Sequence, residues 1–209
     1  MSYLDHRDDE IDTTEWIDIY TALKALNPKR NEVIVELCAG KGYLMHFLSR
    51  KLGNEVVGVD LEGCKYNNKV ICMDLSKEDP PRGDIYVFQH CIEHIPQLRA
   101  RDILKQALMH GRAVIGILPG HKVDDPTHIV NHYHLDDIMD IVRYVNPPYF
   151  ILRPDIRSYA YPASLDYLLV MSKTPVKKVD TMPARLALVV WLYRKLLFDT
   201  LTPVITGGG

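Results

Sequence analysis

Short apolar runs rich in Val and Ile recur along the chain, and each has the length of a buried strand. The first five lie at 33–37, 56–59, 69–73, 85–88 and 113–118. Continuous apolar runs are typical of parallel strands that are covered on both faces. The pattern therefore predicts a parallel sheet with helices on both sides.

Helical patterns separate several of these runs and follow the last of them. Three sets of apolar side chains each share one helical face: Leu44, Phe47, Leu48 and Leu52; Ile103, Leu104, Ala107 and Leu108; Leu135, Ile138, Met139 and Val142. Two final runs, at 149–155 and 165–171, leave no room between them for a crossover helix, so they are expected to pair as an antiparallel hairpin. We predict an α/β fold: a seven-stranded, mostly parallel, doubly wound sheet that ends in this hairpin.

The 209 residues suffice for one compact domain, and no Pro/Gly/Ser-rich linker divides them. We expect this domain over 31–175, preceded by a helical extension over 1–30 and followed by another over 176–209. The first extension contains a predicted helix over 14–26, in which Trp16 and Tyr20 are candidate lid contacts. The second contains an apolar helix over 184–198, whose uncharged run at 186–193 is far shorter than the ~18 residues that a membrane span needs. This helix packs on its own domain, forms a homodimer or attaches to a lipid surface, and the sequence leaves these alternatives open.

Charge and cysteine content narrow the functional classes. The formal net charge of -2 gives no broad field that would attract nucleic acid or an anionic membrane. The acidic N-terminus lacks the apolar core of a signal peptide. The four cysteines, Cys38, Cys64, Cys72 and Cys91, contain no CxxC pair, and we expect reduced thiols in a cytoplasmic protein.

The first predicted strand breaks into a glycine turn and then opens an amphipathic helix. The segment reads Glu36-Leu37-Cys38-Ala39-Gly40-Lys41-Gly42. Glycines allow a sharp turn and a close approach to a ligand, and free N–H groups at a helix start favour electron-rich atoms, so the segment predicts a nucleotide-type cofactor. A nicotinamide or flavin dinucleotide is disfavoured, because its third glycine would fall at Met45.

With the residues downstream, the chain resembles the class I S-adenosylmethionine (SAM) dependent methyltransferases over roughly 33–171. The resemblance implies that the turn from Glu36 to Gly42 wraps the methionine part of SAM, with Cys38 in place of the first glycine. It also implies that Asp60 at the end of the second strand binds the ribose hydroxyls, and that Asp74 after the third strand binds the adenine amino group. Leu75 is the implied apolar wall beside Asp74, and Leu61, which follows Asp60, is a further cofactor-binding candidate. Taken alone, Asp60 is better interpreted as a strand-end turn former and Asp74 as a helix N-cap before Ser76. Their joint placement favours the cofactor roles.

The fourth strand continues as Gln89-His90-Cys91-Ile92-Glu93-His94, which is similar to the Glu-His signature of many small-molecule, glycan and lipid methyltransferases. The resemblance places Gln89 and His90 beside the transferred methyl group, where an oxygen acceptor needs a base. After the fifth strand, the element Asp125-Pro126-Thr127-His128 resembles a substrate-side insertion. His90 and His128 are therefore the catalytic candidates, although His128 serves equally well to fix its loop. His132 and His134 are interpreted as ordinary loop or cap residues.

A metal site is a further hypothesis. Some methyltransferases that carry Glu-x-x-Glu-His hold a divalent ion beside the acceptor, and here His90 replaces the first glutamate. His90, Glu93 and His94, with His128 or His121, would form a suitable ligand set. The alternative is that Glu93 and His94 only support the helix start, and the sequence does not decide between the two.

We expect an enzyme that transfers the methyl group of SAM to an oxygen or nitrogen of a small molecule, glycan or lipid-linked acceptor. The alternative is a catalytically inactive SAM-binding regulatory or interaction subunit. Nucleic acid is an unlikely substrate, because no Asn/Asp-Pro-Pro-Tyr motif follows the fourth strand. The stretch 146–149 reads Asn-Pro-Pro-Tyr, but it precedes the predicted hairpin.

Overall fold

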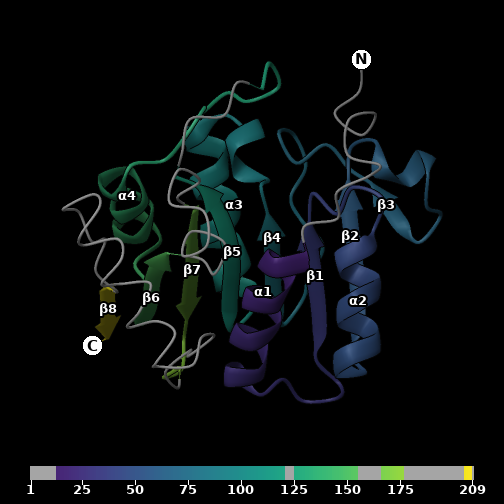
Figure 1. Cartoon of the computed structure of the whole chain (residues 1–209), viewed down its shortest axis with the longest axis horizontal. Helices are drawn as coiled ribbons and strands as arrows, with labels where there is room; N and C mark the ends of the chain where they lie inside the picture. The colour runs from purple at the N-terminus through teal and green to yellow at the C-terminus, as the bar shows by residue number, and fades with distance from the viewer. Residues whose placement is uncertain (1–12, 121–124, 155–165, 177–204, 209) are drawn as a thin grey trace.

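One mixed β-sheet forms the centre of the molecule (Figure 1). The computed structural model describes residues 13–120, 125–154, 166–176 and 205–208. The strands are, in chain order, β1 (Val33–Leu37), β2 (Glu55–Asp60), β3 (Val70–Cys72), β4 (Ile85–Gln89), β5 (Ala113–Pro119), β6 (Tyr149–Pro154), β7 (Asp166–Ser172) and β8 (Ile205–Gly208). They lie side by side in the order β3-β2-β1-β4-β5-β7-β6-β8.

The direction of the strands confirms the predicted doubly wound sheet. Strands β1 to β5 run parallel to one another, whereas β7 runs antiparallel between β5 and β6. Strand β8 pairs antiparallel with β6 and is an addition that the sequence did not predict. It lies in the predicted C-terminal extension, whose apolar helix over 184–198 falls outside the described residues.

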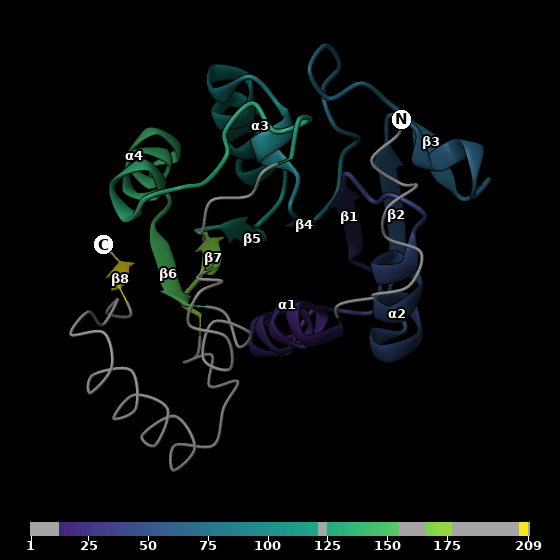
Figure 2. The ribbon, with the colours of Figure 1, turned by 45° about the horizontal axis from the view of Figure 1, so that its top comes forward.

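Two layers of helices cover the sheet (Figure 2). Helices α1 (Thr13–Leu26) and α2 (Tyr43–Leu52) lie on one face, and α3 (Gln97–His110) and α4 (Leu135–Val145) lie on the other. Neighbouring residues of one strand pack against different helix layers. Ile34 belongs to the core under α1 and α2, and Val35 belongs to the core under α3 and α4. Because successive side chains of a strand point to opposite faces, a strand buried on both faces must be apolar throughout.

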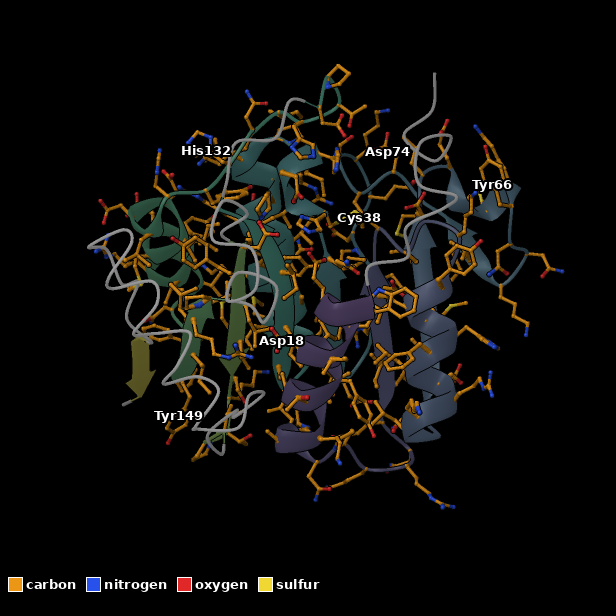
Figure 3. The ribbon with its side chains drawn as sticks, viewed as in Figure 1. Asp18, Cys38, Tyr66, Asp74, His132 and Tyr149 are labelled. Carbon is orange, nitrogen blue, oxygen red and sulfur yellow. A yellow bond between two sulfur atoms is a disulfide. The ribbon has the colours of Figure 1, made fainter. Side chains whose placement is uncertain are left out.

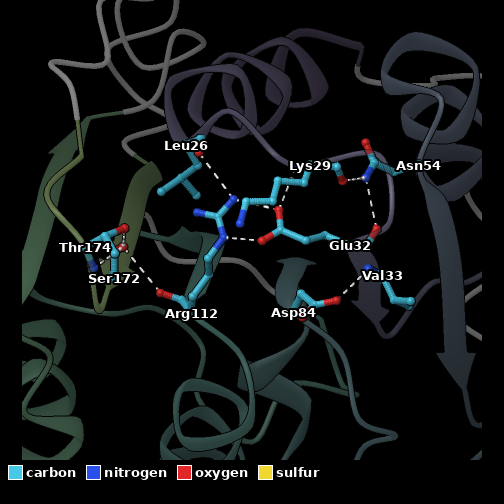
Figure 4. Close-up of polar contacts among 9 residues, drawn as sticks. All are labelled: Leu26, Lys29, Glu32, Val33, Asn54, Asp84, Arg112, Ser172 and Thr174. Carbon is cyan, nitrogen blue, oxygen red and sulfur yellow. Dashed lines mark hydrogen bonds and ion pairs between the residues drawn. The ribbon is translucent and has the colours of Figure 1, made fainter.

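A polar group holds the amino edge of the sheet together (Figure 4). Arg112, at the start of β5, donates from Nε and Nη2 to the two carboxylate oxygens of Glu32 at 2.7 and 2.8 Å. The amide of Asn54 donates to the carbonyl of Glu32, and the carboxylate of Asp84 accepts from the N–H of Val33. The bidentate Arg112 contact lowers the pKa of Glu32, although partial burial opposes it.

The cysteines correct the expectation of reduced thiols. Cys38 is joined to Cys91, and Cys64 to Cys72, as two disulfides with Cα–Cα separations of 5.5 and 5.2 Å. The spacing of the cysteines did not predict either pair. Each disulfide joins segments beside neighbouring strands, and the strand order cannot be seen in the spacing. The cysteines therefore give no support to the expectation of a cytoplasmic protein.

Among the described residues, no helix has both the length and the apolar character needed to cross a bilayer.

Candidate functional site

The turn after β1 takes a left-handed backbone at every second residue. The φ angles of Cys38, Gly40 and Gly42 are 54°, 53° and 79°. Glycine adopts this conformation freely, whereas a side chain there costs about 1–2 kcal/mol. Cys38 accepts that conformation, and its sulfur is bonded to Cys91 in the loop after β4. In Figure 3, Cys38 lies toward the carboxyl edge of the sheet.

Asp60, the last residue of β2, holds this turn. Its Oδ2 accepts a hydrogen bond from the N–H of Gly40 at 2.9 Å. Its Oδ1 accepts from the N–H groups of Glu62 and Gly63 at 2.8 and 2.7 Å. The turn and the loop after β2 lie so close that a Cβ on Gly63 would be 1.8 Å from the carbonyl oxygen of Gly40. A carboxylate offers roughly four acceptor positions. The described residues occupy three of them, which leaves the fourth mainly on Oδ2.

Glu36 lies beneath the turn and is buried. It accepts a hydrogen bond from the backbone of Met45 in the first turn of α2, and its Oε2 has no partner among the described residues. Burial raises the pKa of Glu36 to about 8, with the negative charge of Asp60 adding to the effect. At neutral pH this side chain is therefore mostly protonated, and it supports the turn from below.

The candidates beyond β2 and β3 differ in exposure. Leu61 is 62% exposed beside Asp60, whereas Leu75 is buried at 5%. The carboxylate of Asp74 accepts hydrogen bonds from the N–H and hydroxyl of Ser76 and pairs with Lys77 at 2.6 Å. Asp74 thus has the local turn contacts that the capping interpretation expects, and part of its acceptor capacity is used by the protein itself.

Gln89 and His90 end β4 and face the first turn of α1. The amide of Gln89 accepts from the indole N–H of Trp16 at 3.0 Å and donates to Glu15. His90 lies between two carboxylates, with its Nε2 3.1 Å from Glu15 and its Nδ1 3.3 Å from Glu93. Burial alone would lower the pKa of His90, but Glu15 and Glu93 raise it to about 10. With that pKa, His90 is an imidazolium at neutral pH and holds a proton rather than accepting one.

Glu93, His94 and His128 converge on one point from two segments. One potential ligand atom from each lies within 4.8 Å of the others. Glu93 is fully buried, and its Oε2 has no hydrogen-bond partner among the described residues. Its carbonyl accepts from the N–H groups of Ile129 and Val130 at 2.8 and 3.1 Å, which fixes the loop that carries His128.

The two imidazole rings of this group lie edge to face, with centroids 4.5 Å apart. Burial and the neighbouring His94 lower the pKa of His128. His128 is therefore neutral at neutral pH, in the form that accepts a proton or binds a metal. The arrangement splits the hypothesised ligand set. His90 contacts Glu93 only through Nδ1, and its Nε2 faces Glu15 and Asp166.

The remaining histidines have local roles or cannot be placed. His132 and His134 are partners of each other at 3.0 Å between their Nε2 atoms. The backbone N–H of His134 donates to Asp137, so His134 caps α4 as expected. His121 lies outside the described residues.

We compared the chain and this arrangement of strands with known proteins. No protein-family model matches the chain, and no curated protein matches its sequence. Several solved structures, however, align with the chain. The small RNA methyltransferase HEN1 aligns with a TM-score of 0.59 at 12% identity, over 78% of this chain and 26% of HEN1. The 1,6-didemethyltoxoflavin-N1-methyltransferase of Burkholderia thailandensis, with S-adenosylhomocysteine (SAH) bound, aligns with a TM-score of 0.57 at 18% identity. The alignment covers 83% of this chain and 84% of that enzyme.

A third match, the plantazolicin methyltransferase BpumL in complex with SAH, has a TM-score of 0.57 at 12% identity, over 76% of this chain and 82% of BpumL. The chain has the class I SAM-dependent methyltransferase fold. It therefore shares the arrangement of the sheet with these enzymes. In this chain the carboxyl edge of the sheet carries the glycine turn, Asp60 and the loop after β4. The chain spans only about a quarter of HEN1, 26% of its length.

The sequence did not predict a role for two buried residues at the carboxyl edge of the sheet. Glu15 in α1 and Asp166 at the start of β7 are buried and face His90. The available signal was a charged residue within an otherwise buried face or strand. It could not name His90 as the partner, because 75 residues separate His90 from Glu15.

Proposed function

We propose that the protein is a SAM-dependent methyltransferase that acts on an oxygen or nitrogen of a small molecule, glycan or lipid-linked acceptor. The observation that carries the proposal is the bond between Gly40 and Asp60, which joins the cofactor turn to the end of β2. It supports a preformed cofactor site in which Oδ2 of Asp60 accepts a ribose hydroxyl. The exposed side chain of Leu61 then covers one face of the adenine.

The glycine turn contributes backbone N–H groups for the methionine part of SAM. In this proposal Ala39, Gly40, Lys41 and Gly42 line that part, Cys38 and Glu36 fix the turn, and Gln89 closes the site from β4. Asp74 and Leu75 flank the adenine on the other side. The methyl group passes to the acceptor, the sulfonium becomes the neutral thioether SAH, and the acceptor releases a proton.

His128 is the residue proposed to take that proton. Its neutral state suits a base, whereas His90, as an imidazolium between Glu15 and Glu93, is proposed to position the loop after β4. In-line methyl transfer depends mainly on dry positioning, so a base supplies only part of the rate.

The test uses methyl-labelled SAM with phenolic, amine, sugar and lipid-linked acceptors, and compares His128→Ala with His132→Ala. His132 lies in the same loop but outside the converging group. Label transfer should fall about 10²- to 10⁴-fold in His128→Ala and stay unchanged in His132→Ala. Equal rates in both variants would remove His128 from catalysis.

A divalent cation is a second arrangement of the same site. The observation that favours it is the fully buried carboxylate of Glu93, whose Oε2 has no hydrogen-bond donor among the described residues and which lies beside His94 and His128. Glu93, His94 and His128 would hold the ion, which would supply a Lewis acid for the acceptor. His128 would then be a ligand rather than a base. Metal analysis of the purified protein, with activity before and after chelation, decides between the two.

The inactive SAM-binding subunit is kept as the alternative for a specific reason. Asp60 and Asp74 already accept hydrogen bonds from the protein at several positions. If SAM binds and no acceptor class is methylated, the regulatory reading replaces the enzyme. We also propose a cytoplasmic location, and a homodimer or a peripheral membrane contact through 184–198.

A further inference from the structure

The Cys38–Cys91 disulfide crosses the carboxyl edge of the sheet, between the glycine turn and the loop after β4. Strands β1 and β4 pair in parallel up to Leu37 and Phe88, and the disulfide lies immediately beyond this last pair. Cys38 is half-buried, whereas Cys91 is fully buried. The bond therefore links two segments that are proposed to hold SAM, namely the turn that lines its methionine part and Gln89 at the end of β4.

The backbone is left-handed at both ends of this bond. Among the described residues, those that carry a side chain and have φ angles in the left-handed range are Asn27, Cys38, His90 and Asn146. The two asparagines follow the last residues of α1 and α4, a position where asparagine commonly adopts this conformation. Cys38 and His90, with φ angles of 54° and 48°, lie away from the carboxyl ends of helices. Cys38 is one partner of the disulfide, and His90 directly precedes the other.

A left-handed residue that has a Cβ persists only where its surroundings hold it. With the disulfide closed, Cys38 cannot leave this conformation without moving the loop after β4. With the disulfide open, Cys38 and His90 are released toward the ordinary negative φ range. Relaxation at Cys38 turns the chain that leads to Gly40, whose N–H donates to Asp60 at 2.9 Å. Relaxation at His90 disturbs the bond from its own N–H to the carbonyl of Ile117 at 3.2 Å.

We propose that the Cys38–Cys91 bond is a thiol–disulfide switch that sets the conformation of the glycine turn. The closed form holds the turn and the loop after β4 in the arrangement proposed to bind SAM, and the open form releases both. This consequence for SAM rests on the proposed function, because it names what controls the proposed cofactor site.

The reductant that opens the switch is a dithiol. One of its thiolates attacks Sγ of Cys38, the more exposed of the two sulfurs, and forms a mixed disulfide, while the sulfur of Cys91 leaves and takes up a proton. The second thiol of the reductant then displaces Cys38, which is protonated in turn. The dithiol is thereby oxidised to a disulfide, and its two electrons and two protons reduce the protein disulfide to two thiols.

The second disulfide gives the matched control. Cys64 and Cys72 join the loop after β2 to the end of β3, and neither has a positive φ angle. Full-length Cys64→Ser/Cys72→Ser therefore leaves the Cys38–Cys91 bond as the one disulfide that a reductant can open, because the sequence contains four cysteines. Alkylation and mass spectrometry confirm that both thiols are free after treatment with dithiothreitol.

The test compares the oxidised and reduced forms of this variant by hydrogen exchange and by calorimetric titration with SAM and SAH. Reduction should speed exchange in segments 36–42 and 88–94 while α3 and α4 stay protected. It should also weaken binding of SAM and SAH about tenfold or more, which corresponds to the relaxation of at least one left-handed residue. If this variant fails to fold, Cys38→Ser/Cys91→Ser should show the same faster exchange in both segments without any reductant.

The two readouts separate the switch from the proposed function. Unchanged exchange in both segments overturns the switch, whatever the protein binds. Exchange that rises equally in α3 and α4 also overturns it, because the bond would then hold the whole fold. A local change in exchange with equal affinity of both forms for SAM overturns the control of the cofactor site. A local change in exchange with no binding of SAM or SAH by either form supports the switch and contradicts the proposed function.

Discussion

The backbone N–H of Gly40 donates to Oδ2 of Asp60 at 2.9 Å, which ties the turn after β1 to the last residue of β2. Two further N–H groups, from Glu62 and Gly63, hold Oδ1 of the same carboxylate. Asp60 is thus fixed in orientation before any ligand arrives, and one acceptor position stays open on Oδ2. A site of this kind loses little conformational freedom on binding, because its polar groups are already in place.

Replacing Glu36 by Gln should remove a pH-dependent loss of stability. The pKa of Glu36 is raised from 4.5 to about 8, mainly by burial. The folded state therefore keeps a proton that the unfolded state has released, so the stability contributed is complete below pH 4.5 and is lost as the pH rises toward 8. Over that range the wild type should lose on the order of 4 kcal/mol through this group. Glu36→Gln stays neutral and keeps an acceptor for the Met45 N–H.

Thermal melts of both proteins from pH 5 to 8.5 check this prediction. The advantage of Glu36→Gln should grow with pH. Parallel curves for the two proteins would mean that Glu36 is ionised in the folded state throughout.

The Glu32–Arg112 contact should stabilise the fold above the acid range. Arg112 lowers the pKa of Glu32, so the stability it contributes is present above the unfolded pKa of 4.5 and is lost as the pH falls through the lower folded value. We expect Glu32→Gln to cost roughly 1–3 kcal/mol at pH 7 and less at pH 3. Urea unfolding at the two pH values measures the difference.

The exposed pair Asp140–Arg143 is the matched control, because its N–O distance is also 2.7 Å. Asp140→Asn should cost about 0–1 kcal/mol, since both side chains are solvated. A cost in Glu32→Gln no larger than in this control would show that the amino-edge group contributes little.

The two disulfides should differ in their contribution to stability. Cys38 and Cys91 are 53 residues apart, whereas Cys64 and Cys72 are 8 apart. Loop-closure entropy predicts about 4 kcal/mol for the longer loop and about 2–3 kcal/mol for the shorter one. Denaturant unfolding of the Cys38→Ser/Cys91→Ser and Cys64→Ser/Cys72→Ser double variants compares them. If reductant leaves the wild-type midpoint unchanged, the pairs are not bonded in solution.

How much the sequence predicts depends on the distance over which each contact forms. The strands and the hairpin follow from local apolar runs, and the observed ends differ from the predicted ones by a residue or so, as at β2 (Glu55–Asp60). The glycine turn after β1 is equally local, because the positive φ angles of Gly40 and Gly42 favour glycine. These features are encoded within a few residues of one another.

Contacts between segments that lie far apart in the sequence were harder to predict. The Cys38–Cys91 bond and the approach of Glu15 to His90 depend on which strands and helices become neighbours, and no spacing in the chain encodes that. Strand β8 ends in glycines, whose weak strand preference concealed its pairing with β6. Such side-chain meetings become predictable only after the strand order is known.

The most direct test of the cofactor site is calorimetric titration of SAM and SAH into the wild type, Leu61→Gln and Met109→Gln. Leu61 and Met109 are 62% and 65% exposed, so neither change should disturb the core, and only Leu61 adjoins Asp60. The account predicts binding by the wild type and Met109→Gln, and about tenfold weaker binding by Leu61→Gln, since covering a leucine side chain is worth about 1.5 kcal/mol. Failure of the wild type to bind either ligand, or equal binding by all three proteins, would contradict it.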